Sequence, residues 1–374
     1  MKLVIDCFKL IKGTGKSIGI YNLTRNLVEQ LALHRRKEDT IIVLGTRHNQ
    51  EDFRIPGVRF VSVKYDPRNK LICILWELYL VTIALKRLKA DRVLFPRGFA
   101  PLWHPAEDYV IVHDMIPFYY DKEFPGVLNP LENFYIMWRL KSSIRYSHGV
   151  ITDSQASKEE ILCLTGVAEE KVQVVYPGQN QLDLSAIKEA DVSSELDKLE
   201  GQDYVCAITS GLPHKNATGI LKSYERYCNL CRMPLPMVII GLENVNAYDV
   251  PDEIKKHIIC IKYLKEDAQM YKVVMESNVF LFLSLQEGFG FPPLEAMQLG
   301  VPVICSNKSS LPEVTGMAAE LVDPKDTNLV AESLKCLIED KKRQDSLREK
   351  GYVNINRFLW KNCIEDYMRI LFYP

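Results

Sequence analysis

The sequence predicts an α/β protein built from two doubly wound parallel sheets. Short apolar runs alternate with longer amphipathic runs along most of the chain, and this alternation is typical of parallel strands joined by right-handed helical crossovers. The alternation is interrupted at 179–202, where Asp, Glu, Ser and Lys predominate. We therefore expect two domains, 1–178 and 203–356, joined by a linker at 179–202.

Composition narrows the class of protein and of partner. The chain has 374 residues, 47% of them hydrophobic, as expected of a soluble protein with well-formed cores. Its 47 basic and 48 acidic residues give no overall basic field, so we expect no nucleic-acid partner. The ten cysteines lack framework spacing and the N-terminus lacks a signal-peptide core, which favours the cytoplasm. Cys228 and Cys231 have no second Cys-x-x-Cys pair, so a structural role is expected.

The elements of the first domain follow from the periodicity of apolar residues. The expected strands are 3–7, 40–44, 58–63, 92–95, 109–113 and 150–152, and the expected helices are 20–33, 71–88 and 131–146.

The second domain repeats this pattern. Its expected strands are 204–209, 237–241, 257–261, 279–283 and 301–305, with helices between them. A last helix is expected around 360–371. Open α/β sheets bind ligands at the carboxyl ends of their strands, so two facing sheets would form a cleft there.

The segment from Glu287 to Glu295 sets two carboxylates either side of a glycine-rich turn, after the apolar run 279–283. Pro292 or Pro293 suits a first helical turn. Amides at that helix start, beside glycines that admit a ligand closely, favour phosphate, while carboxylates accept hydrogen bonds from sugar or ribose hydroxyls. The pattern predicts a nucleotide-sugar site, although two solvated glutamates around a turn would give the same pattern.

Three further positions could carry chemistry. His113 and Asp114 follow a predicted strand, where polar residues belong at the ligand edge, but a buried histidine bonded to a carbonyl is also common. Lys215 lies in a strand-to-helix loop and could supply positive charge to a diphosphate, although a lone loop lysine is usually solvated. The glycine loop contains Gly13, Gly15 and Gly19. Gly13-x-Gly15-x-x-Ile18 has isoleucine in place of the third glycine of the dinucleotide fingerprint, which disfavours a dehydrogenase.

Several motifs resemble, in order, those of family 4 of the glycosyltransferases (GT4). They are 16–21, 113–117, 154–158, 174–178, 211–216 and 287–314. The resemblance implies the GT-B fold, with two facing Rossmann-like domains, a deep interdomain cleft and a C-terminal helix, 357–374, that crosses back to the first domain. It also implies a retaining enzyme that uses a nucleotide-diphosphate sugar.

The resemblance also implies roles for individual residues. His113 would contact the donor sugar near the reacting carbon, and Glu287 would bind hydroxyls of that sugar. The implied donor-binding residues are His214, Lys215, Gly288, Phe289, Gly290, Phe291 and Glu295, with Glu295 on the ribose in the first turn of its helix. Gly15, Gly19 and Asp114 would border the acceptor and phosphate.

The sequence departs from the family pattern in two places. Ser17 stands where a glycine is frequent, and a second basic residue near Lys215 is missing. Either His214 protonates when diphosphate binds, or a helix N-terminus supplies the missing positive charge. No Asp-x-Asp occurs in the sequence, so we expect turnover without a metal ion and without a cofactor.

The resemblance implies a retaining transferase that attacks from the same face, with the leaving phosphate helping to deprotonate the acceptor. The resemblance suggests GDP-mannose as the first choice of donor, with mannose transferred during assembly of a bacterial surface polysaccharide. A sugar-nucleotide epimerase of this fold and a degenerate donor-binding subunit remain as alternatives.

The acceptor is expected to be a glycan or a lipid-linked glycan. The apolar segment 71–85, which has basic neighbours from Arg68 to Lys89, is too short to span a bilayer comfortably and contains Glu77. It either rests on the inner face of the cytoplasmic membrane as a peripheral contact or forms a core helix.

Overall fold

The computed structural model describes residues 1–12, 18–199 and 201–373, and forms two compact units. The first unit is Met1–Asn180 together with Phe358–Pro374, and the second is Gln181–Arg357. Gly13, Gly15 and Ser17 lie outside the described residues.

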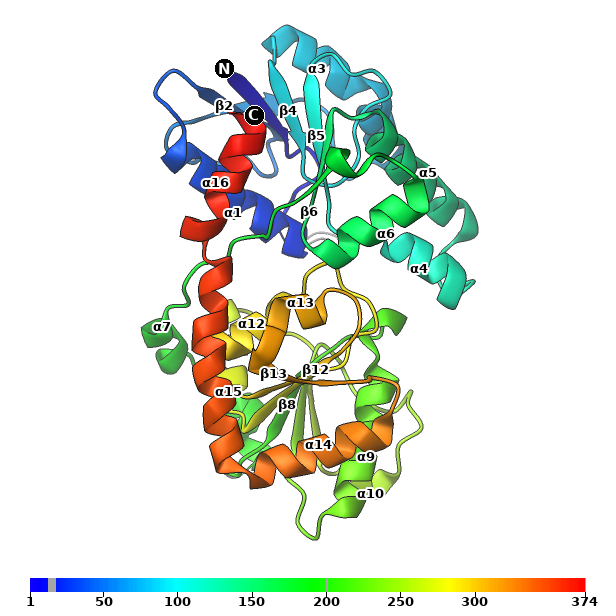
Figure 1. The fold of residues 1–374 in the computed structure, drawn as a ribbon, viewed down its shortest axis with the longest axis vertical. Helices are drawn as coiled ribbons and strands as arrows, with labels where there is room; N and C mark the ends of the chain where they lie inside the picture. The colour runs from blue at the N-terminus through cyan, green and yellow to red at the C-terminus, as the bar shows by residue number, and fades with distance from the viewer. Residues whose placement is uncertain (13–17, 200, 374) are drawn as a thin grey trace. The chain divides into compact units, whose positions relative to one another are not determined.

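The first unit is built on a seven-stranded parallel sheet with the order β3-β2-β1-β4-β5-β6-β7 (Figure 1). The order reverses between β1 and β4, as in doubly wound folds. Its strands are β1 (Lys2–Asp6), β2 (Thr40–Thr46), β3 (Val58–Val63), β4 (Arg92–Phe95), β5 (Glu107–Val112), β6 (Gly149–Thr152) and β7 (Val172–Val174). All the predicted strands are present, and β7 is an addition at the edge.

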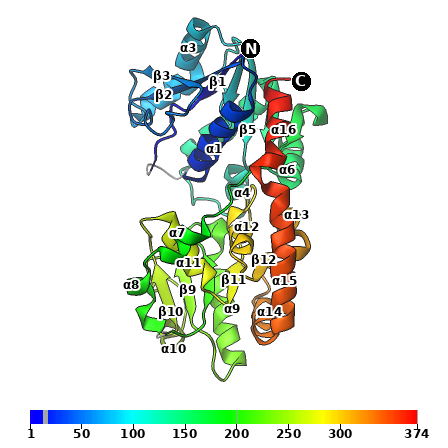
Figure 2. The ribbon, with the colours of Figure 1, turned by 90° about the vertical axis from the view of Figure 1, so that its left-hand side faces the viewer.

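Helices cover both faces of this sheet, which explains why its strands are mainly apolar. One face packs on α2 (Lys70–Leu75), α3 (Val81–Leu88), α5 (Pro130–Tyr146) and α6 (Gln155–Thr165), with strand residues such as Val4 and Val93 in a common core. On the other side α1 (Ile18–His34) packs against α16 (Trp360–Leu371), as Figure 2 shows. The C-terminal helix is therefore part of the first unit.

The predicted helix 71–88 is divided by a π-helical turn. It consists of α2 (Lys70–Leu75), the π-helix η1 (Trp76–Leu80) and α3 (Val81–Leu88). One face is buried, but Leu71, Leu75, Tyr79 and Ile83 are exposed. The segment therefore contributes one face to the core, as a core helix would, and presents a second apolar face to solvent.

The second unit holds a six-stranded parallel sheet with the order β10-β9-β8-β11-β12-β13. Helices α9 (Ala217–Leu230) and α14 (Thr327–Glu339) pack together over one face and share its core. The strands are β8 (Val205–Ile208), β9 (Met237–Ile240), β10 (Ile258–Ile261), β11 (Val279–Phe282), β12 (Val303–Ser306) and β13 (Ala319–Val322). The edge strand β13 had no predicted counterpart.

The expected linker, 179–202, falls mostly in the second unit, which begins at Gln181. It contains α7 (Leu184–Glu189) and α8 (Ser193–Leu196). Lys272 Nζ donates to the carbonyl oxygen of Lys188 at 3.0 Å. A polar composition here reflects short helices on the surface of a domain, not a free connection.

In the part of the chain that the structure describes, no helix has the length and apolar character needed to cross a membrane.

Candidate functional site

Glu287 and Lys215 form a direct ion pair in the second unit. Lys215 follows β8 and Glu287 follows β11, and these two strands are neighbours in the sheet, so their carboxyl ends meet at one edge. Lys215 Nζ lies 2.6 Å from Glu287 Oε1, and the Glu287 side chain is 11% exposed. The structure thus brings together a predicted sugar-binding carboxylate and a predicted phosphate-binding cation.

Backbone and side-chain hydrogen bonds fix the loops that carry this pair. The amide of Leu285 donates to the carbonyl oxygen of His214 at 2.7 Å, and Thr209 Oγ1 donates to the carbonyl oxygen of Lys215 at 2.9 Å. Asn216 Nδ2 donates to the carbonyl oxygen of Leu283 at 3.0 Å. The two loops are therefore held as one unit, which pre-organises the ion pair.

The turn formed by Gly288, Phe289 and Gly290 leads directly into α12 (Phe291–Gln298), which has proline in its first turn as predicted. Gly290 is the N-cap residue with φ 104°, and a Cβ there would lie 2.5 Å from Leu311 Cδ2. Only glycine suits this position. No side chain caps α12, so the positive end of its dipole is suited to an anion.

Two serines support this turn from the loop after β12. Ser310 Oγ donates to the carbonyl oxygen of Phe289 at 2.8 Å, and Ser309 Oγ donates to that of Glu287 at 2.6 Å. Both serines lie in the family motif, but the sequence did not indicate that they brace the backbone beside Glu287.

Glu295 lies in the second turn of α12, which corrects the expectation that it lies in the first. Tyr271 Oη, from α11 (Asp267–Met275), donates to Glu295 Oε1 at 3.1 Å. Burial raises the pKa of Glu295 to about 7, against the hydrogen bond from Tyr271, which lowers it. Sequence reasoning missed Tyr271 because no motif links this helix to Glu295.

His214 is buried beside Lys215. Burial, together with the positive charge of Lys215, lowers the pKa of His214 to about 4. The ring is therefore neutral at pH 7 in this structure, and it would have to gain a proton when diphosphate binds in order to supply a second positive charge. The uncapped N-terminus of α12 is the other candidate for that charge.

His113 follows β5 in the first unit, and both of its ring nitrogens contact protein acceptors. Nδ1 lies 2.7 Å from Asp153 Oδ2, and Nε2 lies 2.9 Å from the carbonyl oxygen of Pro96. Burial opposes protonation, but the Asp153 carboxylate and the Pro96 carbonyl overcome it and raise the pKa of His113 to about 9. The ring is thus held as an imidazolium with both N–H groups engaged, a pairing that the sequence did not indicate.

The remaining predicted residues of the first unit lie in local structure. Asp114 Oδ1 accepts a hydrogen bond from the amide of Ile116 at 2.9 Å, at the start of α4 (Ile116–Glu123). Gly19 is exposed within the first turn of α1. Gly15 lies outside the described residues.

Within the described ranges, no group of three or more His, Cys, Asp or Glu side chains is arranged to hold a metal ion.

Two sequence-family models together match most of the chain. The model described as "Glycosyltransferase Family 4" matches residues 19–180, and that described as "Glycosyl transferases group 1" matches residues 189–354. Each match falls almost entirely within one of the two units.

The chain is also similar to curated proteins. It is 26% identical over 386 residues to O-antigen chain mannosyltransferase B of Escherichia coli, covering 96% of this chain and 97% of that protein. It is 28% identical over 228 residues to O-antigen chain mannosyltransferase RfbU of Salmonella typhimurium, covering 58% of this chain and 57% of RfbU.

Solved structures share the fold at low sequence identity. WaaG, a glycosyltransferase involved in lipopolysaccharide biosynthesis, aligns with a TM-score of 0.70 and 12% identity over the whole of both chains. Anabaena HepE, in complex with UDP and glucose, aligns with a TM-score of 0.68 and 15% identity over 99% of both chains. With its two parallel-sheet units and both family matches, the chain belongs to family 4 of the glycosyltransferases and has the GT-B fold.

Proposed function

We propose that the protein transfers mannose from GDP-mannose to a hydroxyl of a glycan or lipid-linked glycan during assembly of a surface polysaccharide. The transfer retains the anomeric configuration and needs no metal ion or cofactor. The names of the Escherichia coli and Salmonella relatives support the sugar and the pathway class. The observation that carries the enzymatic assignment is the buried Lys215–Glu287 pair beside the uncapped N-terminus of α12.

Each part of this site has a separate role in the proposed transfer. Lys215 and the N-terminus of α12 offset the charge that develops on the departing diphosphate. Glu287 accepts hydrogen bonds from the donor sugar, and Glu295 accepts them from the ribose. The acceptor oxygen bonds to the anomeric carbon on the face from which the diphosphate leaves, and the acceptor proton passes to that phosphate.

Donor binding tests the first part of the proposal. Thermal shift and saturation-transfer NMR would compare GDP-, UDP-, dTDP- and ADP-sugars, with and without EDTA. We expect selective binding of GDP-mannose that EDTA does not change and that Glu295→Ala abolishes. The control is Glu243→Ala, because Glu243 forms an exposed ion pair with Lys262 in the same unit and should bind the donor as the wild type does.

Product analysis separates the proposal from its alternatives. NMR of the product should show the axial glycosidic bond of the donor retained. Conversion of the donor sugar without any acceptor would instead indicate an epimerase. Absence of both transfer and hydrolysis, with donor binding intact, would indicate a degenerate donor-binding subunit.

The exposed face of α2, η1 and α3 supports contact with a membrane that presents a lipid-linked acceptor. Leu71 is 72% exposed and Trp103, nearby, is 67% exposed, with Lys86 Nζ 4.4 Å from the centre of the Trp103 ring. Exposed apolar residues flanked by cations are typical of helices that lie in an anionic membrane surface.

Vesicle sedimentation tests this contact. The wild type should bind vesicles that contain phosphatidylglycerol more tightly than pure phosphatidylcholine vesicles, and Leu71→Ser with Ile83→Ser should weaken binding at least fivefold. The matched control is Leu230→Ser, which changes an exposed leucine of the second unit. Equal binding of all three proteins would remove the membrane from the proposal.

A further inference from the structure

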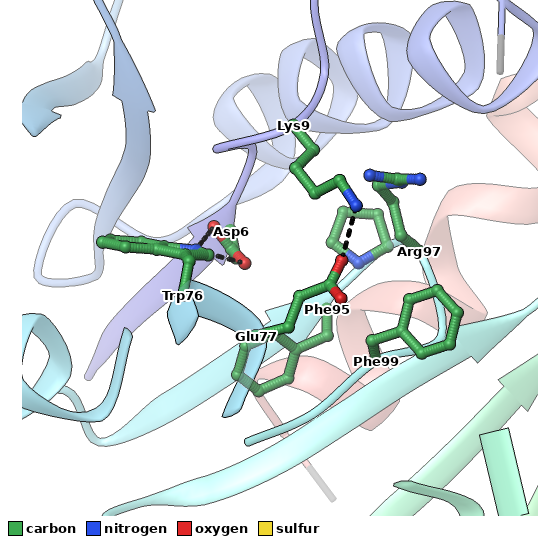
Figure 3. Close-up of a pocket in the computed structure, with 8 residues that line it drawn as sticks. Asp6, Lys9, Trp76, Glu77, Phe95, Arg97 and Phe99 are labelled. Carbon is green, nitrogen blue, oxygen red and sulfur yellow. Dashed lines mark hydrogen bonds and ion pairs between the residues drawn. The ribbon is translucent and has the colours of Figure 1, made fainter. Parts of the chain in front are cut away.

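A polar pocket lies in the first unit where the strand order reverses. Strands β1 and β4 are neighbours there, and the chain continues from them toward opposite edges of the sheet. Open α/β sheets bind ligands at the carboxyl ends of the strands at this point. The pocket is lined by Asp6, Lys9, Trp76, Glu77, Phe95, Pro96, Arg97 and Phe99 (Figure 3).

Two carboxylates contribute the acceptor groups of this pocket. Asp6, the last residue of β1, accepts hydrogen bonds from Trp76 Nε1 at 3.2 Å and from the amide of Phe8 at 3.1 Å. Glu77 is 7% exposed and pairs with Lys9 Nζ at 2.9 Å. Burial raises the pKa of Asp6 to about 6, so Asp6 is mainly ionised at pH 7.

Arg97 adds a donor without a partner. Its Nε is buried and makes no hydrogen bond with any described residue, and Figure 3 shows its guanidinium beside Lys9 at the pocket. A buried N–H that remains unpaired costs free energy. A ligand oxygen in the pocket would remove that cost.

The π-helix η1 creates the polar wall. Its first two residues, Trp76 and Glu77, are both buried and line the pocket. Such π-helical turns occur frequently at functional sites.

The size and the surroundings of the pocket limit what enters it. Its interior has room for about one water molecule, at roughly the minimum volume such a molecule needs. A hydroxyl or hydroxymethyl group fits, whereas a whole sugar ring would remain at the mouth. The carbonyl of Pro96, in the pocket wall, contacts His113 Nε2 at 2.9 Å, so the pocket adjoins a residue of the predicted site.

We propose that this pocket binds a hydroxyl group of the acceptor sugar, an inference that rests on the proposed transferase function. The hydroxyl donates its hydrogen to Asp6 or Glu77, and its oxygen accepts a hydrogen bond from Arg97. This arrangement satisfies the free donor and uses one of the two buried acids. It also gives the first unit a means of selecting acceptors by the position of one hydroxyl.

The test uses a panel of methyl glycosides of mannose, glucose, galactose, rhamnose and N-acetylglucosamine. Saturation-transfer NMR would measure their binding to the full-length protein in the presence of GDP. Asp6→Asn and Glu77→Gln each replace a carboxylate by an amide of the same shape. The matched control is Asp108→Asn. Asp108 is also buried in the first unit, and it accepts hydrogen bonds from the side chain of His104 and from the backbone amide of His148.

At least one glycoside should bind the wild type and the Asp108→Asn control, and should bind Asp6→Asn, Glu77→Gln or both at least tenfold more weakly. Monodeoxy forms of that glycoside should identify one hydroxyl whose loss has the same effect. No binding of any glycoside, or binding that survives both pocket substitutions within twofold, would overturn the inference. GDP affinity is measured in the same samples. If the wild type does not bind GDP, that result contradicts the proposed function and not this inference. Circular dichroism identifies a variant that fails to fold, in which case the other pocket variant decides.

Discussion

Each unit holds a lysine paired with a buried glutamate near the carboxyl ends of its parallel strands, and the two pairs are similarly exposed to solvent. The lysine side chain is 27% exposed in both, and the glutamate is 8% exposed in Lys9–Glu77 and 11% exposed in Lys215–Glu287. They differ in how the sequence encodes them. Glu287 lies in a contiguous family motif, whereas Glu77 enters from a π-helical turn far from Lys9 along the chain.

This difference shows that a site is recognised from a sequence motif when its backbone turn restricts which residues can occupy it. The turn at Gly290 requires glycine, because a Cβ there would strike Leu311, and that requirement leaves a readable pattern. The pocket around Glu77 is assembled by packing of separate segments, and packing constrains residue type only loosely. Equal burial and equal charge therefore do not make two sites equally visible in a sequence.

The largest expected effect distinguishes the two pairs by function. Glu287→Gln should lower transfer by about 100- to 1,000-fold, because it removes a preorganised charge beside the reacting sugar. It should also weaken donor binding, since the donor sugar loses a carboxylate that accepts its hydrogen bonds. Glu77→Gln, the matched change in the other pair, should leave the donor dissociation constant within twofold. Isothermal titration with GDP-mannose and initial-rate kinetics measure both quantities, and equal loss of donor affinity in the two variants would contradict the distinction.

Much of the fold could be predicted from local sequence. The expected strands 58–63 and 92–95 and the helix 360–371 match β3, β4 and α16 residue for residue. The edge strands β7 and β13 were missed, because three or four residues with polar members give too little periodicity.

The site was predictable only in part. The motif located Glu287, Lys215 and Glu295, but not Tyr271 or Asp153, which contact site residues from other elements. Such partners are chosen by tertiary contact and leave no local spacing in the chain.

The second prediction concerns His113, whose pKa of about 9 contrasts with that of His214 in the other unit. A raised histidine pKa stabilises the fold below the unfolded value of about 6.5, and that stabilisation is lost as pH rises through about 9. Asp153→Asn should therefore cost about 2 to 3 kcal/mol of unfolding free energy at pH 6 and little of this above pH 9.5. Urea unfolding across this range measures the difference, and a cost independent of pH would mean that His113 is not held protonated.

The third prediction uses the opposite shift at His214. Its folded pKa of about 4 lies below the unfolded value, so the unfolded chain binds the extra proton and the wild type loses stability as pH falls from 6.5 toward 4. In His214→Gln that loss is absent. The unfolding free energy of the variant relative to the wild type should rise by about 2 kcal/mol between pH 7.5 and pH 5.

The control for this measurement is His34→Gln, because His34 is exposed at the end of α1 in the first unit. Its relative stability should change little over the same pH range. If His214→Gln behaves like His34→Gln, then burial does not hold the His214 ring neutral.

The smallest expected effect tests the hydrogen bond that the sequence did not reveal, between Tyr271 and Glu295. This bond lowers the pKa of Glu295 against the effect of burial, which raises it to about 7. Tyr271→Phe removes the hydroxyl alone, so the pKa of Glu295 should rise further and less of the carboxylate should be ionised at pH 7. If ionised Glu295 accepts the ribose hydroxyls, GDP affinity should fall about fivefold at pH 7, which corresponds to about 1 kcal/mol.

The pH dependence of binding distinguishes this effect from a simple loss of packing. The affinity of the wild type for GDP should rise as pH increases through about 7, and in Tyr271→Phe the midpoint of that rise should move to higher pH. The two proteins should then bind GDP equally well at pH 9, where Glu295 is ionised in both. Tyr248→Phe is the control, since Tyr248 lies in the same unit and packs beside its core. A uniform loss of affinity at every pH would show that Tyr271 supports the shape of the site and not the charge of Glu295.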